Sequence, residues 1–166
     1  PDVNATGNKA TENVYVYLNA GAVLPVAQNF SPVVFPPTDW VVDNPGNDPN
    51  KWIRGLQGLG GGTGSAKIPF FDIEDGKIDN LAAPKMDFST LSAPINLTFD
   101  LAHKRRSATT IDQLTVMASG DCGTTWNQVW QKSGAALATT TGYATTTYTP
   151  LVPDWQNQVI NMDAYA

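Results

Sequence analysis

Side chains that end in oxygen are concentrated in the segment DNPGNDPN, residues 43–50. Its glycine and two prolines bend the chain into a compact turn. Five side chains in this segment carry a carboxylate or amide oxygen: Asp43, Asn44, Asn47, Asp48 and Asn50. Calcium takes about six to eight such hard oxygens, main-chain carbonyls included. The spacing differs from that of an EF-hand, so two interpretations stay open: a calcium site, or a network of Asx turns without metal.

Tryptophans are the second group that could bind a ligand. The chain has five: Trp40, Trp52, Trp126, Trp130 and Trp155. An exposed indole can stack on the face of a sugar, whereas a buried one belongs to the core. Trp40 adjoins two valines and is assigned to the core. Trp52, beside a glycine-rich loop, and Trp130 are predicted to be the exposed, ligand-binding pair.

The stretch SGDCGTTW, residues 119–126, matches the pattern S-x-D-x-G-x-x-W of the Asp-box, a hairpin motif of sialidase propellers. Each of its key residues has a structural task. Asp121 is expected to accept backbone N–H groups within the turn. Gly123 is expected to take a positive φ, and Trp126 to pack beneath the hairpin. The motif therefore predicts a turn and does not by itself predict catalysis.

Sialidase chemistry also needs a cluster of arginines, and the chain has three: Arg54, Arg105 and Arg106. As neighbours on an expected strand, Arg105 and Arg106 would point to opposite faces. A propeller blade takes about 40 to 50 residues, so 166 residues are too few for a complete propeller. A sialidase is therefore disfavoured.

Other titratable side chains admit a catalytic and a structural interpretation. An acidic cluster around EDG could hold a glycosidase pair, but it is more simply a solvated hairpin turn. Its members are Asp72, Glu74, Asp75 and Asp79. The single histidine, His103, is expected to pack at the rim of the fold, and the single cysteine, Cys122, to serve the turn. No G-x-S-x-G motif supports a serine hydrolase, so we predict no enzyme activity.

The composition indicates what positions these residues. Threonine, valine, asparagine, glycine and proline are abundant, and such a chain favours strands and turns over helices. The formal net charge of −5 argues against nucleic acid as a partner. No apolar run reaches the length of a transmembrane helix, so no membrane insertion is expected.

Alternating hydrophobicity marks the strands most clearly in INLTFDLAH, where Ile95, Leu97, Phe99, Leu101 and His103 share one face. The segment DQLTVMAS alternates in the same way, and WQNQVINMDAY ends the series. The prolines of PVVFPP exclude a central strand there. An all-β fold of antiparallel hairpins follows, either a sandwich or a barrel.

Read in order, several segments resemble the jelly-roll modules of large secreted Bacteroidetes proteins, related in pattern to gingipain cleaved-adhesin and MAM-like domains. The matching segments are NFSPVVFPPTDWVVDN, NKW, DNLAAPKMDFS, INLTFDLAHK, DQLTVMASGDCGTTW and WQNQVINMDAYA. The resemblance implies an antiparallel β-sandwich with jelly-roll topology over residues 23–166. Residues 1–22 are similar to the last strand and linker of a preceding PKD- or Ig-like module.

The resemblance further implies structural calcium at Asp43, Asn47, Asp48 and Asp79. It implies a non-catalytic accessory module, secreted or at the bacterial cell surface, exported by the type IX route. Expected partners are a glycan or an extracellular protein and neighbouring domains of the parent chain. The alternatives are a structural spacer beside a secreted metalloprotease or other hydrolase and, remotely, a glycosidase fragment. Family members usually continue beyond the equivalent of Ala166, so the jelly roll is expected to lack its last strand or strands.

Overall fold

The computed structural model describes residues 21–73 and 75–166, and within them strands predominate. The strands are β1 (Val41–Asp43), β2 (Ile53–Gly55), β3 (Ser65–Lys67), β4 (Asn80–Ala82), β5 (Asn96–Leu101), β6 (Gln113–Ala118), β7 (Asn127–Ser133) and β8 (Gln156–Asn161). The helical elements are short: α1 (Gly134–Leu137) and the 3₁₀ turns η1 (Leu59–Gly61), η2 (Val152–Asp154) and η3 (Asp163–Tyr165). The predicted all-β class is confirmed. Most of the unit predicted at 1–22, a last strand and a linker, lies outside the described residues.

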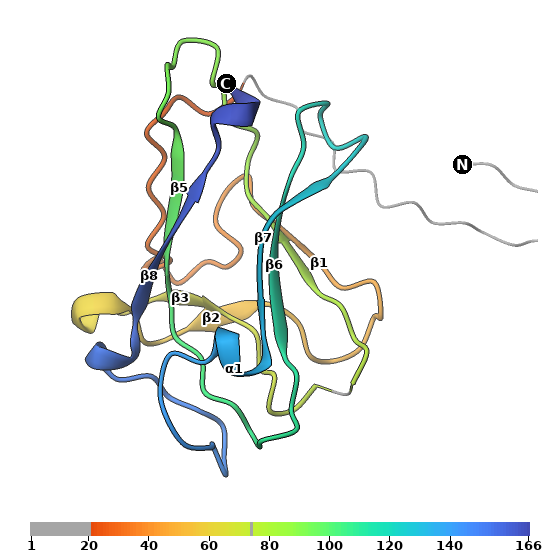
Figure 1. The fold of residues 1–166 in the computed structure, drawn as a ribbon, viewed down its shortest axis with the longest axis vertical. Helices are drawn as coiled ribbons and strands as arrows, with labels where there is room; N and C mark the ends of the chain where they lie inside the picture. Colours follow the sequence, from red (N-terminus) through yellow and green to blue (C-terminus); the bar gives the residue numbers. More distant parts are fainter. Residues whose placement is uncertain (1–20, 74) are drawn as a thin grey trace, which may run out of the picture.

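The strands form four antiparallel pairs: β1–β4, β2–β3, β5–β8 and β6–β7. Figure 1 shows β5–β8 and β6–β7 as two long upright ribbons, with β2–β3 crossing below their middle. Among the described strands each pair is hydrogen-bonded only within itself, so they do not join into two continuous sheets. The β1–β4 pairing sets Asp43 opposite Asn80, which brings the end of the first strand to the start of the fourth.

The predicted alternation of β5 is confirmed. Leu97 and Phe99 turn inward while the side chains between them face solvent, and Ile95, just before the strand, is buried. In the partner strand β8, Ile160 lies opposite Leu97 and is buried. The inward face of β8 also carries a polar residue, Gln158, which is buried and whose Oε1 accepts a hydrogen bond from Lys132 Nζ at 2.8 Å.

The core lies between the inner faces of the two long pairs. Its buried residues are Ile95, Ile160 and Met162, and the half-buried side chains packed on them are Phe88, Leu97, Phe99, Val116, Ala118, Val129, Trp130 and Tyr165. Most of these side chains come from β5, β8 and the residues next to them on one side and from β6 and β7 on the other, while Phe88 precedes β5 and Tyr165 lies in η3. Burying one large aliphatic side chain stabilises a fold by about 1.5–3 kcal/mol. This face-to-face packing holds the longest strands in place.

The valine-rich segment before β1 forms no strand, and its prolines had excluded a central one. Val33 and Val34 are instead exposed. None of the helices in the described part of the chain has the length and apolar composition to cross a bilayer.

Candidate functional site

The loop after β1 curls back on itself through its own amide groups. Asn44 Nδ2 donates to the Asp48 carbonyl at 2.7 Å, and the Asn47 N–H donates to the Asn44 carbonyl at 3.0 Å. Asn47 has a φ of 46°, a left-handed conformation that asparagine tolerates better than most residues. The Asn50 N–H donates to Asp48 Oδ1 at 3.0 Å. The loop is therefore a compact turn whose bonds leave some of its oxygens unused.

Three oxygens at this loop are buried without a hydrogen-bond donor among the described residues: Asn44 Oδ1, Asp48 Oδ2 and Asp79 Oδ1. Two of them face one space. A Cβ built on Gly46 would lie 2.9 Å from Asp48 Oδ2 and 3.7 Å from Asn44 Oδ1. A buried acceptor without a donor costs about 1–3 kcal/mol. Their burial together indicates a place for a positively charged group.

Asp79 reaches the loop through strand pairing. It directly precedes β4, and β4 pairs with β1 so that Asn80 Nδ2 donates to Asp43 Oδ2 at 2.9 Å. The Trp52 indole N–H donates to the Asp79 carbonyl at 3.1 Å and holds this segment from the other side. Asp79 therefore lies beside the loop, as the resemblance implied, and its role as a metal ligand stays a prediction.

Electrostatics at the loop favour an added cation. Burial raises the pKa of Asp79, and the nearby carboxylates of Asp48 and Asp43 raise it further. Among the described residues, the ammonium group in ion-pair reach of the loop is that of Lys77, whose Nζ lies 4.0 Å from Asp48 Oδ2. A bound cation would relieve the repulsion between these carboxylates and lower the pKa of Asp79.

The donor set fits calcium only if amide or main-chain oxygens contribute. Within residues 21–73 and 75–166, no three His, Cys, Asp or Glu side chains are assembled as metal ligands. Asn44 supplies one of the buried oxygens, although the predicted ligand set named Asn47. Asn47 itself is exposed, and it bonds to Asn44 through its main chain. Calcium accepts such neutral oxygens beside one or two carboxylates.

The two tryptophans predicted to bind a ligand are both half-buried. The Trp52 indole N–H is bonded to the Asp79 carbonyl. Trp130 packs edge-to-face on Phe99, with ring centroids 5.4 Å apart, and belongs to the core. The exposed tryptophan is Trp126, with 42% of its surface accessible, although it was expected beneath the hairpin. Its ring covers Gly123, where a Cβ would lie 3.6 Å from the indole.

Apart from Trp126, the SGDCGTTW turn has the geometry that its sequence predicted. Asp121 Oδ1 accepts the Thr125 N–H at 2.8 Å, and Asp121 Oδ2 accepts the Thr125 hydroxyl at 2.6 Å. Ser119 adds a further bond, its hydroxyl donating to Asp121 Oδ1 at 2.7 Å. Gly123 has the predicted positive φ of 88°, and Cys122 shares this conformation at 58°. Hydrogen bonds from Thr125 and Ser119 lower the pKa of Asp121 to about 2. Its carboxylate thus serves the turn.

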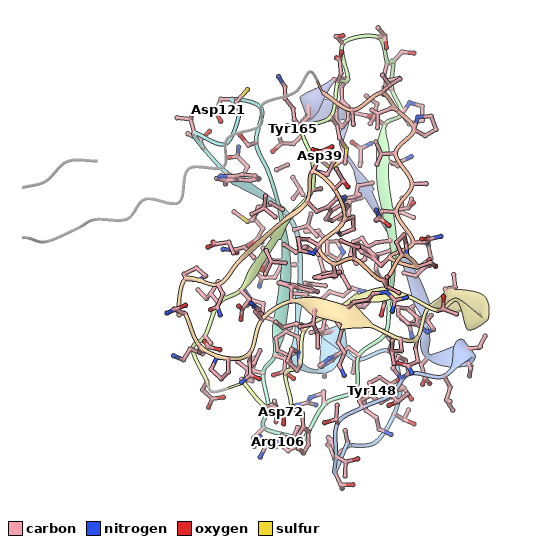
Figure 2. The ribbon with its side chains drawn as sticks, turned by 180° about the vertical axis from the view of Figure 1, so that it is seen from behind. Asp39, Asp72, Arg106, Asp121, Tyr148 and Tyr165 are labelled. Atoms are coloured by element: carbon pink, nitrogen blue, oxygen red, sulfur yellow. The ribbon has the colours of Figure 1, made fainter. Side chains whose placement is uncertain are left out.

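Replacing Asp121 by alanine is expected to loosen the turn without unfolding the protein. The Thr125 amide should lose its acceptor and exchange its hydrogen about tenfold faster or more, and the melting temperature should fall. Hydrogen-exchange NMR measures the first effect and calorimetry the second. Asp72→Ala, a change at an exposed carboxylate at the opposite end of the molecule (Figure 2), should alter neither. Unchanged protection at Thr125 would contradict the account.

His103 is buried, as predicted, and faces an acid. Its Nε2 lies 3.5 Å from Asp112 Oδ2, and the Phe70 ring packs on it edge-to-face. Burial, assisted by the nearby Arg105 charge, lowers the pKa of His103 to about 4 despite this carboxylate. Burial also raises the pKa of Asp112. At neutral pH the imidazole is neutral, and packing explains its position.

The arginines are dispersed, although for a different reason than expected. Arg105 and Arg106 do not lie on a strand, because β5 ends at Leu101. Their side chains still separate: Arg105 lies over Tyr143, 6.0 Å from the ring centroid, and Arg106 over Phe71, 4.9 Å from it. Arg54 is bound elsewhere, to main-chain carbonyls. The three guanidinium groups thus have separate partners.

The acidic cluster divides between two environments. Asp72 and Asp75 are exposed, and Gly76 has a φ of 80°, which is consistent with the expected solvated turn. Asp79 belongs with the oxygen-rich loop. Glu74 lies outside the described residues.

The strands and the loop together define the class of this protein. It is an all-β protein of short antiparallel pairs, with a turn that collects buried oxygen atoms. No protein-family model, no curated protein and no solved structure matches the chain. What the chain does therefore has to be inferred from its own residues.

Proposed function

We propose that the chain is a non-catalytic, calcium-stabilised accessory module of a secreted or cell-surface protein, with a glycan or an extracellular protein as its ligand. The observation that carries the proposal is the group of three buried oxygens without donors at Asn44, Asp48 and Asp79. Calcium would supply positive charge to this group beyond that of Lys77, whose ammonium lies 4.0 Å from Asp48 Oδ2. A jelly-roll sandwich is the proposed architecture, supported by the packing of β5–β8 against β6–β7.

The non-catalytic part of the proposal is supported by how the reactive groups are used. The Asp121 carboxylate accepts the hydrogen bonds that close its turn. The imidazole of His103 is buried against Asp112 and Phe70. Burial withdraws His103 from solvent, and the exposed Asp121 carboxylate is engaged by the bonds of its own turn.

One observation favours the alternative of a structural spacer. Of the five tryptophans, all within the described residues, only Trp126 is exposed. A row of exposed aromatic rings, which would favour glycan binding, is not formed by these tryptophans. A spacer would need calcium for stability and no ligand.

Calcium titration tests the proposal. Protein freed of metal by a chelator should gain about 1.4 kcal/mol when calcium is added at about ten times its Kd. The melting temperature should then rise by about 3–6 °C. Calorimetry measures this rise, and the fluorescence of Trp52, which is bonded to the Asp79 carbonyl, provides a local signal.

Asp79→Asn is the decisive variant. Without calcium it should be at least as stable as the natural protein, because it removes a carboxylate whose pKa is raised by burial and by its neighbours. It should also lose the response to calcium. Asp72→Asn, which makes the same change at an exposed site, should keep that response. A natural protein indifferent to calcium, or an Asp79→Asn protein that responds fully, would contradict the site.

A further inference from the structure

A second site lies at the opposite end of the molecule from the Asp121 turn, in the region of Arg106 and Tyr148 (Figure 2). It is a pocket of about 360 Å³ between the loop that follows β5 and the segment that follows α1. The residues that matter for its chemistry are Arg105, Thr141 and Tyr143, and Ala135 and Ala138 form an apolar wall.

Two main-chain hydrogen bonds fix one wall of the pocket to the other. The Thr139 N–H donates to the His103 carbonyl at 2.9 Å, and the Ala144 N–H donates to the Arg105 carbonyl at 2.8 Å. Between these anchors the chain turns at Gly142, whose φ is 73°. The short loop between the anchors is therefore preorganised, which lowers the entropic cost of binding a ligand.

Arg105 brings a positive charge to the pocket wall. Its Nη2 donates to the carbonyls of Ala108 and Thr110, so the head group is held by neutral partners. Its Nε–H is buried and has no acceptor among the described residues. Within the same residues no carboxylate lies within ion-pair distance of this guanidinium. A half-buried cation held in this way favours an anionic ligand.

The surroundings strengthen this preference for an anion. Lys104 and Arg106 flank Arg105, which makes the segment locally basic in a chain of net charge −5. Two acids on adjacent segments lie near these cations, Asp112 near Arg105 and Arg106 and Asp154 near Lys104. Asp154 accepts the Tyr148 hydroxyl at 2.5 Å, and Asp112 lies against His103.

Tyr143 adds an aromatic surface beside the cation. Its side chain is 52% exposed, and Arg105 Cζ lies 6.0 Å from its ring centroid. An exposed ring accepts the C–H face of a sugar, and the hydroxyl of Thr141 in the same wall can bond to a sugar hydroxyl. A ligand that uses all of these groups is a sugar ring that carries a carboxylate.

We propose that this pocket binds a carboxylate-bearing sugar of an acidic glycan, with Arg105 pairing to the carboxylate and Tyr143 supporting the ring. The proposal rests on the glycan-binding form of the function proposed above. It moves the ligand site from Trp52 and Trp130 to a different part of the surface.

The experiment titrates the full chain with an oligogalacturonate and with the same oligomer methyl-esterified at its carboxyl groups. A sialylated oligosaccharide serves as a second acidic probe. Isothermal calorimetry or NMR shift perturbation should give a Kd on the order of 0.1–1 mM for at least one acidic probe. The ester should bind at least about tenfold more weakly, because it lacks the charge that pairs with Arg105.

Three variants locate the site. Arg105→Gln should weaken binding of the acidic probe about tenfold or more. Arg106→Gln removes the same charge one residue away, over Phe71, and should change the affinity less than about twofold. Tyr143→Ala, a change at an exposed side chain that the fold should tolerate, should weaken binding severalfold. The melting temperature of each variant serves as the folding control.

The outcomes separate this inference from the function on which it rests. Equal losses in Arg105→Gln and Arg106→Gln would overturn the pocket and leave glycan binding intact. Binding of the neutral ester as tight as that of the acid would do the same. Failure of every probe, neutral and acidic, would overturn the pocket together with the glycan-binding form of the proposed function, while the calcium titration would still test the stabilising site.

Discussion

Replacing Gly64 by alanine is expected to lower the free energy of unfolding by about 3–5 kcal/mol, or to prevent folding. Gly64 is buried against the main chain of another segment, and a Cβ there would lie 2.0 Å from the Phe30 carbonyl oxygen and 2.6 Å from the Ser31 nitrogen. Neither atom belongs to a flexible side chain, so the two segments would have to separate.

Arg54 makes this separation costly. Its Nε donates to the Phe30 carbonyl at 2.9 Å, and its Nη2 donates to the carbonyls of Ser31 at 2.6 Å and Thr63 at 2.7 Å. The guanidinium thus binds both sides of the contact that Gly64 permits. Pushing the sides apart would strip donors from these carbonyls and leave part of a half-buried charge unsatisfied.

Gly120→Ala is the matched control for this prediction. A Cβ at Gly120 would meet only the Tyr165 ring, at an ordinary contact distance of 3.7 Å. Denaturant unfolding of both variants, followed by tryptophan fluorescence, should show a large loss for Gly64→Ala and a change within about 1 kcal/mol for Gly120→Ala. Similar small changes in both proteins would mean that the segments around Phe30 and Gly64 are not in contact.

Acid is expected to destabilise the protein well above the pH at which most carboxylates titrate. The pKa of His103 is lowered from 6.5 to about 4 by burial and by Arg105. As the pH falls below 6.5, the His103 imidazole becomes protonated in the unfolded chain but stays neutral in the folded protein. The stability that depends on His103 is therefore complete above pH 6.5 and declines until about pH 4. Between pH 7 and 4.5 the loss should be roughly 2–3 kcal/mol.

The variant His103→Gln isolates this effect. It should be nearly independent of pH between about 6.5 and 4.5, because the group that titrates in that window is gone. The raised pKa of Asp112 acts in the opposite direction, since the folded state accepts that proton more readily, and it reduces the decline at the acidic end. Urea unfolding of both proteins at a series of pH values measures how the free energy of unfolding of each depends on pH. A decline in His103→Gln as steep as in the natural protein would contradict the assignment.

Features that depend on residues close together in the chain were predictable from the sequence. The inward face of β5, with Leu97 and Phe99, follows from the two-residue period of a strand. The turn around Asp121 is built from bonds between Ser119 and Thr125, so its motif was sufficient to predict it. Local patterns of this kind are set by side-chain order and need no knowledge of distant segments.

Burial of individual side chains was less predictable. Trp126 and Trp130 lie close together in one hairpin, yet the first is exposed and the second packs on Phe99. Gln158 shares the inward face of β8 with Ile160, and Lys132, from another strand, bonds to its amide oxygen there. Such outcomes depend on which strand supplies the neighbouring side chain, and alternation within one strand does not contain that information.

The sequence by itself determined the all-β class, the faces of the long strands, the turn at Asp121 and the wealth of oxygen ligands after β1. Only the tertiary structure decided which oxygens are left without donors, because Asp79 meets Asp48 through the register of β1 with β4. It also decided that Arg105 shares a pocket with Tyr143, since two hydrogen bonds between distant segments set that loop in place. Both candidate sites arise from contacts between residues far apart in the chain, whose geometry is fixed by pairing and packing.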